Sequence, residues 1–195
     1  YTEKLLLLDG PGFCFEYGID SFPEEPEITR QSLGIPGDAI VFASGANLCK
    51  IIPELMNLWA SILAQVPNSR LLLFPFGVSW SGSYDNVRFY NIFSAVLARH
   101  GVAPNRLIAI RPLPHRGAVR NILKVADIYL DSIRHGGANS LVDPLVLDIP
   151  AIVCLGSNLR ALQGVGMIRD LGIPELIAAD ESEYVALAVE LARNP

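Results

Sequence analysis

One short stretch of the chain combines adjacent glycines with polar residues and could bind a phosphate. An apolar run that ends in Asp131 is followed by Gly136 and Gly137, and then by Asn139 and Ser140. This order predicts a strand, a glycine loop and a helix that begins at an Asn or Ser cap. The first N–H groups of a helix carry partial positive charge and attract anions. An ordinary strand-to-helix turn with a good cap is the alternative interpretation.

A lysine lies at a second place of the same kind. The buried-strand pattern of residues 39–43 is followed by small residues, by Lys50 and by Pro53, which is well placed at a helix N-terminus. Lys50 is the only charged residue between Asp38 and Glu54. We therefore expect it at the end of the strand with no local partner, where a cation can neutralise a phosphate. A solvated surface lysine is the alternative.

Three histidines and three cysteines give no further site from their spacing. His115, with Arg116, follows a proline-stiffened loop from which it could reach a ligand, although an incidental surface histidine is the alternative. The histidines form no HExxH motif, and the sequence contains no Asp-x-Asp pair, so we expect no metal site. Cys14, Cys49 and Cys154 are widely separated, which predicts reduced thiols that act as small apolar residues in a cytoplasmic protein.

Alternating strands and helices must position these residues. Apolar runs predict strands, and 3.6-residue periodicity predicts helices. The expected strands are residues 5–8, 39–43, 70–76, 107–110, 128–130 and 151–155, and the expected helices are residues 53–66, 87–100, 118–125, 140–147, 159–171 and 181–193. This alternation predicts an α/β fold, a Rossmann-like parallel sheet with helices on both faces. In such sheets ligands bind outside the carboxyl ends of the strands, where the glycine loop and Lys50 fall.

The bulk composition excludes several classes of protein. The chain has 195 residues, enough for one sizeable domain. Its charged fraction is 18% and its hydrophobic fraction 51%, so we expect part of its surface to face another domain or subunit. A net charge of −5 without a basic cluster argues against nucleic acid, and no apolar run is long enough for a membrane span. The chain begins at Tyr1 rather than Met, which suggests a fragment of a longer protein.

An ordered set of segments resembles glycosyltransferase family 41. Residues 41–53, VFASGANLCKIIP, are similar to the family segment in which a strand runs into an Asn or Gln, a Lys and a Pro. The resemblance continues at residues 66–69, 105–108, 113–115, 126–131, 172–176 and 183–184. It implies the C-terminal lobe of a two-lobed GT-B enzyme, with residues 1–37 as an initial strand and irregular linker. Residues 38–195 would then form the Rossmann-like nucleotide-sugar-binding domain.

The resemblance also implies an activity. Family 41 comprises protein O-linked N-acetylglucosamine transferases and bacterial adhesin N-glycosyltransferases. The chain would be the donor-binding lobe of a metal-independent, inverting protein glycosyltransferase that needs no cofactor. Its donor would be UDP-GlcNAc or another UDP-hexose, and its acceptor protein would bind through a missing N-terminal lobe. The isolated fragment is therefore expected to be inactive.

Individual positions carry the implied roles. Lys50 matches the lysine that contacts the donor diphosphate and would stabilise the leaving group. Asn47 matches the amide three residues before that lysine, and Asp143 matches the carboxylate that hydrogen-bonds the ribose hydroxyls. The other implied donor-binding residues are His115 near the uracil, Gly136 and Gly137 in the glycine loop, and Asn139 and Ser140 on the phosphates. From its position alone, Asp143 could instead act only on the helix dipole.

Two positions depart from the family pattern. Ala138 stands where the O-linked branch has a histidine before the polar pair, and Ala118 stands where a second histidine packs near the uracil. The loop around Ala138 looks closer to the adhesin-glycosylating branch. These departures keep an alternative open, in which the chain is a degenerate, non-catalytic Rossmann-like binding or interaction module.

Overall fold

A six-stranded parallel sheet forms the centre of the protein. The computed structural model describes residues 26–74, 86–110, 113 and 115–194, together with positions 4, 6, 10 and 12. The strands are β1 (Ile40–Ser44), β2 (Ser69–Leu73), β3 (Leu107–Ala109), β4 (Ile128–Leu130), β5 (Ala151–Cys154) and β6 (Ile177–Ala178). The helices are α1 (Pro53–Gln65), α2 (Asn86–Arg99), α3 (Arg116–Leu123), α4 (Asn139–Val146), α5 (Leu159–Asp170) and α6 (Glu181–Arg193). Short 3₁₀ turns are η1 (Gln31–Leu33), η2 (Leu48–Lys50), η3 (Pro104–Arg106) and η4 (Pro174–Leu176).

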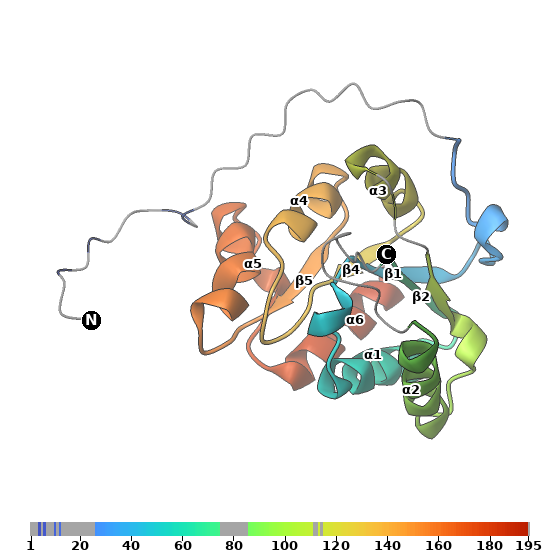
Figure 1. Ribbon diagram of the computed structural model, residues 1–195. Helices are drawn as coiled ribbons and strands as arrows, with labels where there is room; N and C mark the ends of the chain where they lie inside the picture. Colours follow the sequence, from blue (N-terminus) through green and yellow to red (C-terminus); the bar gives the residue numbers. More distant parts are fainter. Residues whose placement is uncertain are drawn as a thin grey trace.

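The strand order places a topological switch point in the middle of the sheet. The order is β3-β2-β1-β4-β5-β6, and every neighbouring pair is parallel. The chain first winds outward from β1 to β3, then returns to the centre and winds outward in the other direction from β4. In open α/β sheets this reversal leaves a crevice at the carboxyl ends of the two central strands. Figure 1 shows β1, β4 and β5 side by side in the sheet.

Helices cover both faces of the sheet, as the sequence predicts. One buried cluster packs α1, α2 and α6 against one face, and its largest side chains include Trp59, Phe93 and Tyr184. The second cluster packs α3, α4 and α5 against the other face. The two helix layers lie on opposite sides of the sheet in Figure 1. The alternating sides of the strands supply both clusters, because successive strand residues point to opposite faces.

Most of the predicted elements are confirmed, with small shifts at their ends. Pro53 is the first residue of α1, Asn158 caps α5 by accepting a hydrogen bond from the amide of Ala161, and Gly101 follows α2 with φ +70°. The two-residue strand β6 was not predicted, because a run this short has no periodicity to detect. The expected strand at residues 5–8 lies outside the described residues. Within the described part of the chain, no helix has the length and apolar content needed to cross a membrane.

The residues just before the sheet are attached to it. Arg30 donates hydrogen bonds to the carbonyls of Val125 and Ala39 and forms an ion pair with Asp127 at 2.7 Å. Ile35 is buried in the cluster of α3 to α5. These contacts place residues 30–35 against the amino-terminal ends of β1 and β4. The switch-point crevice lies at the opposite, carboxyl ends of these strands. The division of the chain at residues 37 and 38 remains a prediction.

Candidate functional site

A cavity of about 240 Å³ opens at the carboxyl ends of β1 and β2. Its lining residues come from the ends of both strands and from the first turns of α3 and α4: Gly45, Phe74, Arg116, Val119, Asn139, Ser140 and Asp143. The fold therefore brings together three of the predicted site residues, Asn139, Ser140 and Asp143. Gly45 allows Phe74 to close one wall, since a Cβ at Gly45 would lie 2.6 Å from the Phe74 ring.

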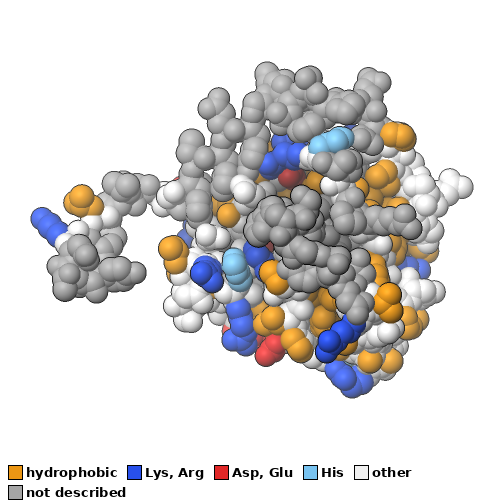
Figure 2. All heavy atoms as spheres, in the orientation of Figure 1, with side chains coloured by type: hydrophobic (Ala, Val, Ile, Leu, Met, Phe, Trp, Pro, Cys, Tyr) orange, Lys and Arg blue, Asp and Glu red, His pale blue; other side chains and the backbone are white. Residues whose placement is uncertain are grey.

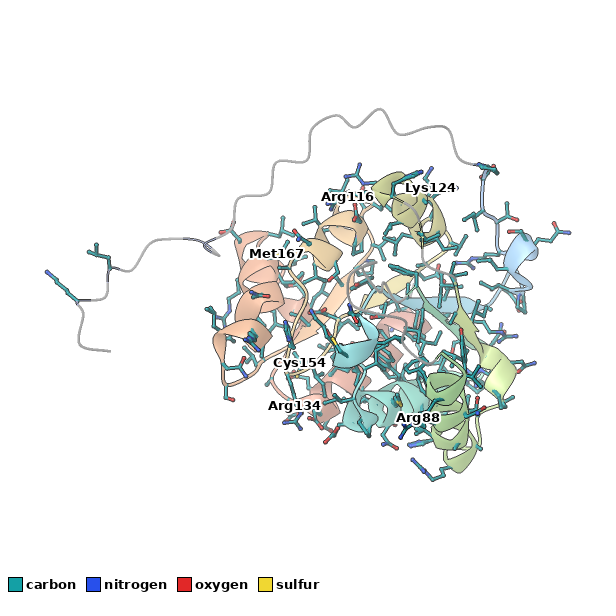
Figure 3. The ribbon with its side chains drawn as sticks, viewed as in Figure 1. Arg88, Arg116, Lys124, Arg134, Cys154 and Met167 are labelled. Carbon is teal, nitrogen blue, oxygen red and sulfur yellow. The ribbon has the colours of Figure 1, made fainter. Side chains whose placement is uncertain are left out.

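Asp143 is held by two arginines at this cavity. Its Oδ1 accepts hydrogen bonds from Nε of Arg116 at 2.7 Å and from Nε of Arg120 at 2.8 Å. Asp143 is 8% exposed and lies on α4, whereas both arginines lie on α3, so the ion pairs join the two helices. Figure 3 shows Arg116 at the junction of α3 and α4. Both of these hydrogen bonds are accepted by the same oxygen, Oδ1.

The glycine loop is fixed by a buried carboxylate. Both oxygens of Asp131 accept hydrogen bonds from the amide of Gly137, at 2.9 and 2.8 Å. A Cβ at Gly137 would lie 2.8 Å from Asp131 Oδ1 and 2.4 Å from Ser140 Oγ. Gly164 in α5 faces the same carboxylate, because a Cβ there would lie 3.0 Å from Asp131 Oδ2. The glycines at 137 and 164 are therefore required by close packing around Asp131.

Burial raises the pKa of Asp131 from 3.8 to about 6, although hydrogen bonds from the amides of Gly137 and Ser132 and the charge of Lys50 oppose the rise. Between these two values the folded protein binds more protons than the unfolded chain, so this group makes the folded state less stable as the pH rises. We expect the free energy of unfolding of Asp131→Asn, relative to the wild type, to rise by about 1.4 kcal/mol between pH 5 and pH 7.5. Urea unfolding at both pH values measures this difference, and equal changes in the two proteins would contradict it.

Lys50 reaches the glycine loop from the other half of the sheet. Asn47 caps η2 by accepting a hydrogen bond from the amide of Cys49 at 3.3 Å, and η2 ends at Lys50. The Lys50 Nζ donates a hydrogen bond to the carbonyl of Gly136 at 3.2 Å. Lys50 was expected to have no local partner, and the partner observed here is not local, because Gly136 is 86 positions away in the sequence. Cys49 is exposed, so the expectation of a small apolar role is wrong for this thiol.

A tyrosine joins the end of β1 to the first turn of α4. The Tyr129 hydroxyl accepts a hydrogen bond from the amide of Gly45 at 3.0 Å and is also hydrogen-bonded to the side chain of Ser140. Tyr129 is fully buried, and this burial raises its pKa far above 10. The hydroxyl is therefore neutral and serves as a fixed link between the two loops that flank the cavity.

The start of α4 differs from the prediction, and His115 also lies at a helix start, where its role near the uracil stays a prediction. Asn139 and Ser140 do not cap α4: the capping residue is Ala138, no side chain caps the helix, and Asn139 and Ser140 form its first turn. His115 is the residue before α3, and its Nδ1 accepts a hydrogen bond from the amide of Ala118 at 3.3 Å. His115 therefore caps a helix next to the cavity and is not among the residues that line it.

Positive charge collects around the glycine loop. Burial lowers the pKa of His135, and the nearby charges of Lys50 and Arg160 lower it further. The carbonyl of Arg160 also accepts a hydrogen bond from the amide of Gly136 at 3.0 Å. Figure 2 shows Lys, Arg and His side chains next to one another on this face. Lys50 and Arg160 thus place two positive charges near the loop, and these favour an anionic ligand.

A larger cavity of about 530 Å³ lies beside β5 and β6 and contains none of the predicted site residues. Arg134 and Glu181, which form an exposed ion pair at 3.0 Å, stand at its rim. Burial raises the pKa of the Cys154 thiol in this cavity to about 11, so the thiol is protonated and unreactive at neutral pH. Among the described residues, no three His, Cys, Asp or Glu side chains are grouped to hold a metal ion.

The fold and the site define a class of protein. The strand order and the cavity at the carboxyl ends of the strands are those of a Rossmann-like lobe of the GT-B glycosyltransferase type. The C-terminal CMP-Kdo binding domain of WaaA from Acinetobacter baumannii shares the fold with a TM-score of 0.53 at 14% identity, covering 85% of this chain and 86% of that one. A trehalose-6-phosphate protein from E. coli bound with UDP-2-fluoro glucose has a TM-score of 0.52 at 16% identity, covering 84% and 40%.

Sequence comparison identifies the family within this class. Residues 20–195 match glycosyl transferase family 41, and the chain belongs to this family. It is 31% identical over 197 residues to a protein of Oryza sativa subsp. japonica named probable UDP-N-acetylglucosamine–peptide N-acetylglucosaminyltransferase SPINDLY, covering 100% of this chain and 20% of that protein. An O-GlcNAc transferase mutant from Thermobaculum terrenum has a TM-score of 0.72 at 28% identity, covering 80% and 29%. The chain thus spans about a fifth of the length of the curated relatives it matches.

Proposed function

We propose that this chain is the UDP-sugar-binding lobe of a metal-independent, inverting protein glycosyltransferase. The observation that carries the proposal is the convergence of Lys50, the glycine loop and the first turn of α4 at the switch point of the sheet. Membership of family 41 and the UDP-N-acetylglucosamine donor in the names of the relatives support it. The donor is UDP-GlcNAc or another UDP-hexose, and the acceptor is a protein side chain presented by a further lobe.

The proposed chemistry is stabilisation of the leaving group. Transfer of the sugar leaves negative charge on the departing UDP diphosphate. The Lys50 ammonium and the first-turn amides of Asn139 and Ser140 would stabilise that charge, because fixed donors and a helix N-terminus favour an anion without reorganisation. A cation supplied by the protein performs the task that a divalent metal would otherwise perform. Asp143, held by Arg116 and Arg120, would accept a ribose hydroxyl.

The remaining assignments belong to the same proposal. Asn47 orders the turn that carries Lys50, and His115 orders the start of α3, so both would act mainly by shaping the walls around the nucleotide. The proposal includes a cytoplasmic location, supported by the free thiols of Cys49 and Cys154.

Calorimetric titration of the chain with UDP tests the proposal. We expect saturable binding that is unchanged by EDTA, because the chain's own cations would hold the diphosphate. CMP is the comparison ligand, since it keeps a phosphate and a ribose but lacks the second phosphate and the uracil, and it should bind more weakly. Absence of saturable binding at millimolar UDP would contradict the donor site and favour the non-catalytic module. Binding that requires a divalent metal would contradict the metal-independent mechanism.

A further inference from the structure

One peptide group in the glycine loop is held from both ends by opposite charges. The carbonyl of Gly136 accepts the hydrogen bond from Lys50, and the amide of Gly137 donates to both oxygens of Asp131. This carbonyl and this amide belong to the same peptide unit. In a planar trans peptide the C=O and N–H point in opposite directions within the plane. Lys50 and Asp131 therefore contact opposite edges of one rigid peptide unit. The peptide dipole is aligned between them, with its negative end toward the ammonium.

Asp131 is itself fixed on the side away from the loop. Its backbone carbonyl accepts a hydrogen bond from the Tyr184 hydroxyl at 2.7 Å, and that hydroxyl accepts one from Trp59 Nε1 at 3.2 Å. Tyr184 lies on α6 and Trp59 on α1, and both are fully buried. The backbone of Asp131 is therefore anchored to α6 and α1, while its carboxylate oxygens face the glycine loop.

Three glycines pack closely against the carboxylate of Asp131. A Cβ at Gly136, Gly137 or Gly164 would lie 3.2, 2.8 or 3.0 Å from an Asp131 oxygen. Asp131 is 3% exposed, and only a planar group with two acceptor oxygens can receive the Gly137 amide in the observed way. An asparagine of the same size would bring an NH₂ group to one of these positions, where it can accept nothing.

We propose that Asp131 is a positioning residue that holds Lys50 in place for the donor diphosphate through the peptide between Gly136 and Gly137. The inference rests on the proposed function, because it assigns Lys50 to the diphosphate. Without the carboxylate the peptide loses the restraint on its amide side, so the Gly136 carbonyl is held less firmly as the acceptor that orients the Lys50 ammonium. Asp131 then acts on the ligand only through Lys50 and touches no part of it.

The test is a double-mutant cycle on UDP-GlcNAc binding with Asp131→Asn, Lys50→Ala and the double variant. We expect Asp131→Asn to weaken binding at least tenfold in a folded protein. We also expect the double variant to bind no more weakly than Lys50→Ala alone, because a residue that acts through Lys50 has nothing left to position. The Gly137 amide resonance reports the peptide directly and should shift in Asp131→Asn. If that variant does not fold, Asp131→Ala, which removes both oxygens, takes its place in the cycle.

The matched control lies at the other end of the same strand. Asp127 is the residue just before β4, and Asp131 is the residue just after it. Like Asp131, Asp127 accepts a hydrogen bond from a backbone amide, that of Val41, to its Oδ2 at 2.7 Å. Asp127→Asn should leave the affinity for UDP-GlcNAc within threefold of the wild type. Additive losses in the cycle, or unchanged binding by Asp131→Asn, would overturn the inference while leaving the proposed function intact. Failure of the wild-type chain to bind UDP-GlcNAc would instead reject the proposed function itself.

Discussion

Replacement of Lys50 by alanine is expected to lower sugar transfer roughly 100- to 1,000-fold in an enzyme that contains this lobe, which corresponds to about 3 to 4 kcal/mol of transition-state stabilisation. The loss falls mainly on turnover, because the charge on the diphosphate grows as the bond to the sugar breaks. The measurement is the rate of transfer from UDP-GlcNAc to an acceptor protein at saturating donor.

A second lysine provides the control for this prediction. Lys124 lies just after α3 and lines a separate cavity at the opposite edge of the sheet, near Pro150 and Asn194. Lys124→Ala removes the same charge from the chain without touching the glycine loop, so its rate of transfer should equal that of the wild type. Near-normal transfer by Lys50→Ala would remove Lys50 from the mechanism.

Replacement of Asp143 by alanine is expected to destabilise the fold by about 2 to 3 kcal/mol and to abolish measurable UDP binding. Without the carboxylate, Arg116 and Arg120 lose the anion that they share at a largely buried place. The cost is below that of a fully buried ion pair because Arg120 is 30% exposed and remains partly solvated. Urea unfolding and UDP calorimetry measure the two effects.

A second Asp–Arg pair, Asp127 with Arg30, serves as a control that distinguishes loss of stability from loss of UDP binding. Asp127→Ala breaks the ion pair with Arg30 at the opposite edge of the sheet, where the two side chains are 30% and 27% exposed. It should destabilise the protein by a smaller amount and leave UDP binding unchanged. Retention of UDP binding by a folded Asp143→Ala protein would show that Asp143 only joins α3 to α4.

The sequence predicts the sheet and its helices well because their signals are local. Pro53 at the start of α1 and the apolar run of β5 each lie within one element and can be recognised without knowing its neighbours. The same locality places Lys50 and the glycine loop at one edge of a parallel sheet. Their functional roles came from the family resemblance and stay predictions that the experiments above test.

The partners of the site residues could not be predicted, since they depend on how the loops and helices fold against one another and not on a local sequence pattern. Asp131 looked like the end of a strand, and nothing near it in the sequence shows that its carboxylate receives the Gly137 amide. Arg120 lies in a helix, where an exposed basic residue is ordinary, and its pairing with Asp143 depends on how α3 packs against α4. The predicted capping of α4 was wrong because the capping position falls one residue earlier, at Ala138, whose side chain has no hydrogen-bond acceptor.

The switch point between β1 and β4 also governs when the lobe becomes able to bind. The hydrogen bonds from Gly45 to Tyr129 and from Lys50 to Gly136 span 84 and 86 positions, so the first three strands can pair before any part of the pocket exists. Closing such long loops is slow and costs chain entropy that only the completed packing offsets. A sugar nucleotide that binds only after β4 has docked on β1 would stabilise that last-formed joint by mass action. Bound donor would then favour the state in which the two halves of the sheet are joined.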